Sequence, residues 1–105
     1  MRDLFIKKII DSIEENPKIM VLTADLGFGL FDDIALKYPK NFINIGVAEQ
    51  NMINIASGMA LEGHKVYTYS IGNFGFMRNL EQIRVNPAYH FLDLNIISNG
   101  GGFAY

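Results

Sequence analysis

Short apolar segments alternate with helix-like segments along this chain, and that alternation constrains its fold more than any other feature. The apolar segments are 18–23 (KIMVLT), 42–45 (FINI), 65–69 (KVYTY) and 93–98 (DLNIIS). Nearly continuous apolar runs of this length are typical of strands that are covered on both faces. The intervening sequence predicts helices before Asn16-Pro17 and at 32–38, 46–62 and 73–85. Strands separated by helices predict βαβ crossovers, and therefore an α/β fold with a parallel sheet and helices on both faces.

The composition is that of one folded domain without a basic surface. Half of the 105 residues are hydrophobic, 19% are charged, and the net charge is −2. Because no basic excess is available to neutralise phosphates, we expect no nucleic-acid or membrane-surface partner. No apolar run reaches bilayer length and no signal-peptide pattern is present, so the expected location is cytoplasmic. The absence of cysteine excludes disulfides, a thiol nucleophile and a thiolate metal site within this sequence.

The sequence ends in NGGGFAY, directly after the fourth predicted strand. A strand of a parallel sheet is normally covered by a following helix, and no helix-like segment remains. We therefore expect residues 1–105 to form the N-terminal portion of a domain that is C-terminally incomplete.

Two other features of the sequence predict neither a nucleotide-binding site nor a metal site. The segment Gly27-Phe28-Gly29 begins a dinucleotide-binding pattern, but the pattern needs a third glycine where Asp32 stands. It is therefore interpreted as a turn between a strand and a helix. His64 and His90 lie in turn-like contexts without partners at ligand spacing, so the sequence predicts no metal site.

Glu49 is an acidic residue on a predicted helical face that is otherwise apolar. In a helix it shares a face with the apolar residues Met52, Ile53, Ala56 and Ala60. An acid in a first helical turn is common because the helix dipole favours it. A carboxylate on an apolar face, however, needs a hydrogen-bond donor to offset its desolvation. No Arg or Lys occurs within eight residues on either side, so we expect a ligand nitrogen to be the donor.

Three segments, in order, resemble the pyrimidine-binding domain of the transketolase family of thiamine diphosphate enzymes. Segment 45–50 (IGVAEQ), followed by the small-residue helix 51–60, is similar to the family's G-(I/V)-x-E-(H/Q) segment. Upstream, 23–26 (TADL) looks like the family's A-D-L strand end. Downstream, 70–84 (SIGNFGFMRNLEQIR) resembles its aromatic segment and the helix that follows. The resemblance covers nearly the whole chain and implies the thiamine diphosphate-binding fold of the pyrimidine-domain type.

The resemblance implies roles for particular residues. Glu49 is the expected catalytic residue, because the family's glutamate meets N1′ of the aminopyrimidine and helps to activate the cofactor. The expected cofactor-binding residues are Asp25, Val47, Glu49 and Phe74, with Phe76 as the alternative stacking aromatic. Arg78 and Asn99 are the expected substrate-binding residues. Asn99 stands where many relatives have a histidine, so the resemblance does not identify the sugar substrate.

The resemblance also implies a partner. Relatives hold the diphosphate and Mg²⁺ with a G-D-G segment on a different domain, and no G-D-G occurs in this sequence. We expect a partner subunit or domain to supply it, within a homo- or hetero-oligomer. The implied activity is transfer of a two-carbon ketol unit between sugar phosphates. The alternatives are a non-catalytic assembly or regulatory domain, and a subunit similar to deoxyxylulose-phosphate synthases.

Overall fold

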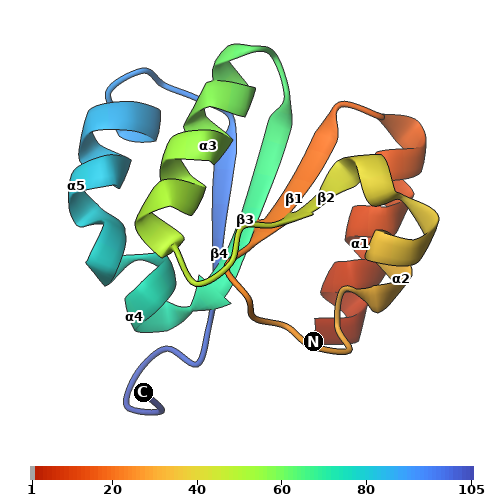
Figure 1. Ribbon diagram of the computed structural model, residues 1–105, viewed down its shortest axis with the longest axis horizontal. Helices are drawn as coiled ribbons and strands as arrows, with labels where there is room; N and C mark the ends of the chain where they lie inside the picture. The colour runs from red at the N-terminus through yellow and green to blue at the C-terminus, as the bar shows by residue number, and fades with distance from the viewer. Residues whose placement is uncertain (1) are drawn as a thin grey trace.

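A computed structural model describes residues 2–105 and shows a four-stranded parallel sheet in the order β2-β1-β3-β4 (Figure 1). The strands are β1 (Ile19–Thr23), β2 (Phe42–Asn44), β3 (Lys65–Ile71) and β4 (Leu94–Asn99). The helices are α1 (Arg2–Glu15), α2 (Asp32–Lys37), α3 (Glu49–Leu61), α4 (Gly72–Gly75) and α5 (Leu80–Ile83). The predicted fold class is confirmed, and each predicted strand begins and ends within two residues of the observed one.

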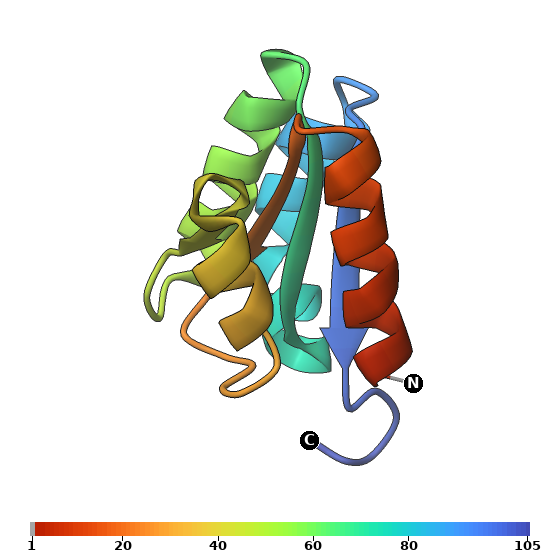
Figure 2. The same cartoon turned by 90° about the vertical axis from the view of Figure 1, so that its right-hand side faces the viewer.

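Helices cover both faces of the sheet, as Figures 1 and 2 show. On one face α1 and α2 enclose an apolar cluster that includes Ile9, Val21, Ile34 and Tyr69. On the other face α3 packs over a second cluster, built around Leu22, Met52, Ala56 and Val66. Strand β1 contributes to both clusters and all five of its residues are buried, which explains its continuous apolar sequence.

The order of the strands determines where a ligand site is expected. From β1 the chain passes through α2 to β2, then crosses back by way of α3 to β3 on the other side of β1. This reversal creates a topological switch point between β1 and β3, and ligands of open parallel sheets bind outside the carboxyl ends of the strands there. The residues that follow the carboxyl ends of β1 and β3, the two strands of the switch point, are 24–26 and 72–75, and α3, which leads from β2 to β3, begins at Glu49.

The prediction of one continuous helix over 73–85 is wrong. The structure has the short α4, a 3₁₀ turn at Met77–Asn79, the short α5 and a π-helical segment at Arg84–Ala88. The Asn79 side chain donates to the carbonyl oxygens of Phe74, at 2.7 Å, and Gly75, at 3.0 Å. Because a buried side chain takes these carbonyls, the backbone does not complete regular helical hydrogen bonds at this point.

No helix within residues 2–105 is both long enough and apolar enough to cross a membrane.

Candidate functional site

Glu49 is the first residue of α3, at the carboxyl edge of the sheet, and only 5% of it is exposed. Its neighbours on the same helical face, Met52 and Ile53, are fully buried. The preceding residue, Ala48, has no side chain that could cap the helix. Glu49 lies in the first turn of the helix, where the partial positive charge of the N-terminus favours an acidic residue.

The expectation that no protein donor reaches Glu49 is wrong. Nη1 of Arg78 lies 3.1 Å from Oε2 of Glu49, and the two side chains form an ion pair. The residues are 29 positions apart in the sequence, and the fold brings them together. The Arg78 side chain is 46% exposed, so solvent screens the pair on one side. Within residues 2–105 the structure gives no hydrogen bond to the other carboxylate oxygen, Oε1.

Arg78 is itself held on several sides. Its guanidinium carbon lies 4.2 Å from the centre of the Phe74 ring, a distance at which the cation is attracted to the ring face. Its backbone carbonyl accepts a hydrogen bond of 3.1 Å from the side chain of Gln50, the residue next to Glu49. Phe74, an expected stacking aromatic for the cofactor, therefore stacks on Arg78 in this structure. Phe76, the alternative aromatic, is 49% exposed.

Asp25 follows β1 and has a backbone φ of 55°, which is unusual for a residue other than glycine. Its N–H donates to Oδ1 of Asn44, at 2.9 Å, and its Oδ1 accepts from Nδ2 of Asn44, at 3.2 Å. The N–H of Gly46 donates to the same Asn44 oxygen, at 3.0 Å. Asn44 thus links the residues after β1 to the loop that leads into Glu49. Sequence reasoning missed Asn44, although an Asn two residues before a glycine at a strand end is a signal for such a turn.

Replacing Asn44 with Ala should lower the free energy of unfolding by about 1 kcal/mol, because two backbone N–H groups lose a side-chain acceptor at an exposed position where water takes its place. Chemical denaturation of the purified chain measures this change. Asn51→Ala, at an exposed position of α3, is the matched control and should shift stability by no more than about 0.5 kcal/mol. Equal effects of the two substitutions on the free energy of unfolding would show that the hydrogen bonds of Asn44 do not stabilise the fold.

The remaining predicted site residues are placed differently. Val47, two residues before the start of α3, is 77% exposed and so presents an apolar side chain to solvent. Asn99 ends β4 and lines a cavity of about 310 Å³ together with Phe5 and Tyr69, on the α1 side of the sheet. Glu49 belongs to the α3 side. The structure therefore gathers Glu49, Phe74 and Arg78 into one cluster and leaves Asn99 outside it.

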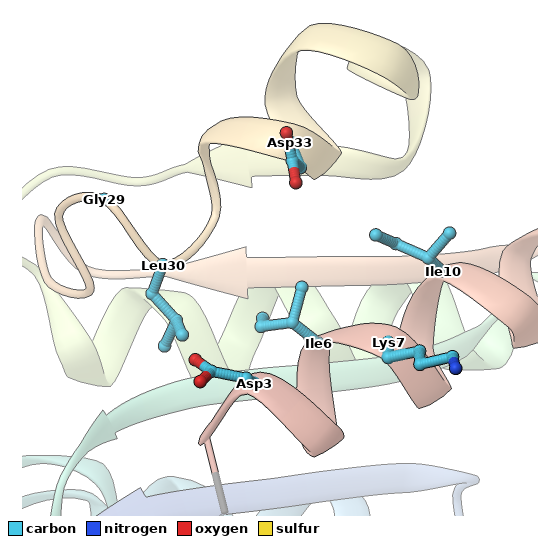
Figure 3. A pocket seen from close by; sticks show the side chains of 7 residues that line it. All are labelled: Asp3, Ile6, Lys7, Ile10, Gly29, Leu30 and Asp33. Carbon is cyan, nitrogen blue, oxygen red and sulfur yellow. The ribbon is translucent and has the colours of Figure 1, made fainter.

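A separate cavity of about 350 Å³ lies between α1 and the loop before α2 (Figure 3). Its lining combines apolar Ile6, Ile10 and Leu30 with the charged Asp3, Lys7 and Asp33 at the rim. It contains none of the site residues discussed above. Among residues 2–105 no three His, Cys, Asp or Glu side chains come together in a way that could hold a metal ion.

Comparison with known proteins agrees with the fold. The family described as "Transketolase, pyrimidine binding domain" matches residues 1–104. The chain belongs to this family of transketolase-type pyrimidine-binding domains, whose members serve thiamine diphosphate-dependent enzymes.

Several relatives are transferase-type enzymes or their subunits. The chain is 31% identical over 105 residues to an apulose-4-phosphate transketolase subunit of Phocaeicola vulgatus, covering 99% of this chain and 34% of that protein. It is 32% identical over 83 residues to 1-deoxy-D-xylulose-5-phosphate synthase of Carboxydothermus hydrogenoformans, covering 77% of this chain and 13% of that protein.

A solved structure described as "Split gene transketolase, inactive beta4 tetramer" superimposes with a TM-score of 0.80 at 34% identity. The match covers 89% of this chain and 31% of that one. The chain thus spans about a third of the length of the transketolase subunits that it matches.

Proposed function

We propose that this chain is the pyrimidine-binding part of a thiamine diphosphate-dependent enzyme that transfers a two-carbon ketol unit between sugar phosphates. The observation that supports this most is the buried Glu49 carboxyl at the start of α3, beside the switch point of the sheet. A domain that serves only assembly has no need of a buried acid in such a place, since burying it costs desolvation energy that the half-exposed ion pair with Arg78 offsets only in part.

The residues present fit an aminopyrimidine. The ring offers a nitrogen that can share a proton with a carboxyl group, and Oε1 of Glu49 is the oxygen that Arg78 leaves available. When bound, thiamine diphosphate supplies the carbon nucleophile of the reaction. Glu49 holds or releases the proton at N1′ of the ring, which is general acid–base assistance by a positioned side chain. The exposed apolar side chain of Val47, two residues before Glu49, is available to pack against the ring.

Asp25 completes the cofactor side of the proposed site. Asn44 fixes its backbone through the hydrogen bonds described above, and the same amide fixes the Gly46 N–H in the loop before Glu49. A single side chain therefore links the backbone of Asp25 to the loop that precedes Glu49. Such preorganisation matters because a misplacement of about 1 Å in a catalytic group can cost about 10²-fold in rate.

In this proposal a partner subunit or domain binds the diphosphate and Mg²⁺. Carboxylates, carbonyls and waters are the usual Mg²⁺ ligands, and residues 2–105 provide no cluster of three metal-ligating side chains. Support also comes from the matches to proteins described as transketolase subunits. The partner is a subunit or domain that carries the G-D-G segment, and the assembly is an oligomer in which the cofactor lies between the two parts.

The purified chain alone should bind thiamine diphosphate weakly or not at all. The charge-assisted contacts of the diphosphate through Mg²⁺ are strong ones, and the partner supplies them. Isothermal titration calorimetry of the chain with thiamine diphosphate and Mg²⁺ measures the affinity, and the complete enzyme is the positive control. Tight binding to the chain alone would contradict the divided site.

The activity itself is tested with the complete enzyme. Ketol transfer between sugar phosphates that disappears when thiamine diphosphate is removed and returns when it is added supports the proposal. A complete enzyme without thiamine diphosphate-dependent transfer would favour the non-catalytic assembly or regulatory alternative.

A further inference from the structure

We propose that Arg78 is a positioning residue, which orients the Glu49 carboxyl so that one oxygen faces the cofactor ring. The inference rests on the proposed function and adds to it a different role for Arg78 from that of a substrate-binding group. It is based on the cluster formed by Glu49, Phe74 and Arg78, and on the way in which the surrounding backbone holds that cluster in place.

The geometry divides the two carboxylate oxygens between two tasks. Oε2 of Glu49 accepts the hydrogen bond from Nη1 of Arg78 at 3.1 Å, and Oε1 is left for a ligand. The last torsion angle of a glutamate side chain has a broad energy profile, so packing alone does not fix the carboxylate plane. A hydrogen bond to one oxygen does fix it. Arg78 also stays charged, so it cannot accept a proton from Glu49 and compete with the ring nitrogen.

The guanidinium is suited to this role because its own freedom is restricted. A long side chain normally loses considerable conformational entropy when it forms an ion pair. The Phe74 ring, with its centre 4.2 Å from the guanidinium carbon, limits movement of the guanidinium on that side, and the Gln50 side chain donates to the Arg78 carbonyl. The fully buried Asn79 in turn ties the backbone of Phe74 in place. Folding of the 72–79 segment therefore already restricts the Arg78 side chain, so that little further conformational entropy is lost when the ion pair forms.

Two other roles for Arg78 would give different kinetic effects when the residue is lost. If Arg78 bound the phosphate of the sugar, its loss would raise KM for the sugar phosphate and leave kcat largely intact. If Arg78 merely occupied the place of the pyrimidine ring until the cofactor arrived, its loss would tighten cofactor binding. A positioning residue instead affects the step that Glu49 assists, so its loss lowers kcat.

The test uses Arg78→Ala and Arg78→Lys in the complete enzyme, with kcat, KM for the sugar phosphate and the dissociation constant of thiamine diphosphate measured for each. Arg78→Ala should lower kcat by about 10- to 100-fold, the usual effect of losing a group that orients a ligating or catalytic side chain. KM and the cofactor dissociation constant should change little. Arg78→Lys should restore part of kcat, because Lys keeps the charge without the planar fork. Arg84→Ala, at an exposed position on the next segment, is the matched control and should behave as the unmodified enzyme.

A structural readout on the purified chain does not depend on activity. The chain has arginines only at positions 2, 78 and 84, so nitrogen-15 NMR can assign their guanidinium signals individually. The Arg78 signal should be distinct from the other two, and Glu49→Gln and Phe74→Leu should each move it toward them. An Arg78 signal that neither substitution changes would overturn the proposal, as would an unchanged kcat in Arg78→Ala.

The outcomes separate this inference from the proposed function. If Glu49→Gln abolishes turnover while Arg78→Ala retains it, the positioning role is wrong and the function of the site stands. If Glu49→Gln also retains turnover, the proposed function itself is wrong.

Discussion

Replacing Glu49 with Gln should lower kcat of the complete enzyme by about 10²- to 10⁴-fold, the usual contribution of a positioned acid or base. Gln has nearly the same shape and can hydrogen-bond to the ring nitrogen, but its amide cannot share a proton with it. The fold should persist, because the substitution removes the charge of a 5% exposed side chain without leaving a cavity. Steady-state kinetics at saturating thiamine diphosphate measure the effect.

Glu62→Gln is the matched control for this substitution. Glu62 lies directly after the other end of α3 and is exposed, so the same chemical change there should leave kcat unaltered. Circular dichroism of both variants checks that the helix is retained. Wild-type turnover in Glu49→Gln would show that Glu49 is an ordinary acid of a first helical turn without a catalytic role.

Replacing Leu22 with Ala should lower the free energy of unfolding by about 2–5 kcal/mol. Leu22 is fully buried in β1, where it packs in the cluster that supports α3. Its loss removes apolar contacts and leaves a cavity that the strands on either side, β2 and β3, cannot readily fill. Since domains of this kind are stabilised by only about 5–15 kcal/mol in total, a large share of the purified chain should be unfolded by mild denaturant.

The control is Leu36→Ala on α2. The Leu36 side chain is 81% exposed, so the same truncation should change the free energy of unfolding by no more than about 0.5 kcal/mol. Urea denaturation of both variants gives the two values side by side. Comparable losses at the two positions would show that the β1 cluster is not the main support of the sheet.

The sequence predicted the strands and their parallel arrangement because buried parallel strands have a direct sequence signature. The run at 18–23 is almost entirely apolar, and β1 is buried at each of its residues. The segment 73–85 was mispredicted because its apolar residues suggested a continuous helix. Whether the backbone continues as a helix there depends on Asn79, which turns its side chain back to two carbonyls. Periodicity does not contain that information.

The site was predictable only in part, for a similar reason. Glu49 was identified from its own helix, since its neighbours at helical spacing are apolar. Arg78 was expected to bind substrate, and its contact with Glu49 was not foreseen because it depends on the tertiary fold rather than on nearby sequence. The link from Asn44 to Asp25 spans 19 residues and two strands, so it too follows from the order of the sheet.

The role of Glu49 can be tested with a crystal structure of the complete enzyme with thiamine diphosphate, through the distance from Glu49 to the cofactor ring. We expect Oε1 of Glu49 to lie within about 2.6–3.2 Å of N1′ of the aminopyrimidine, which is hydrogen-bond reach for proton transfer. Arg78 should remain on Oε2. A ring whose N1′ meets a different group, with the Glu49 carboxyl turned away from it, would show that Glu49 does not activate the cofactor.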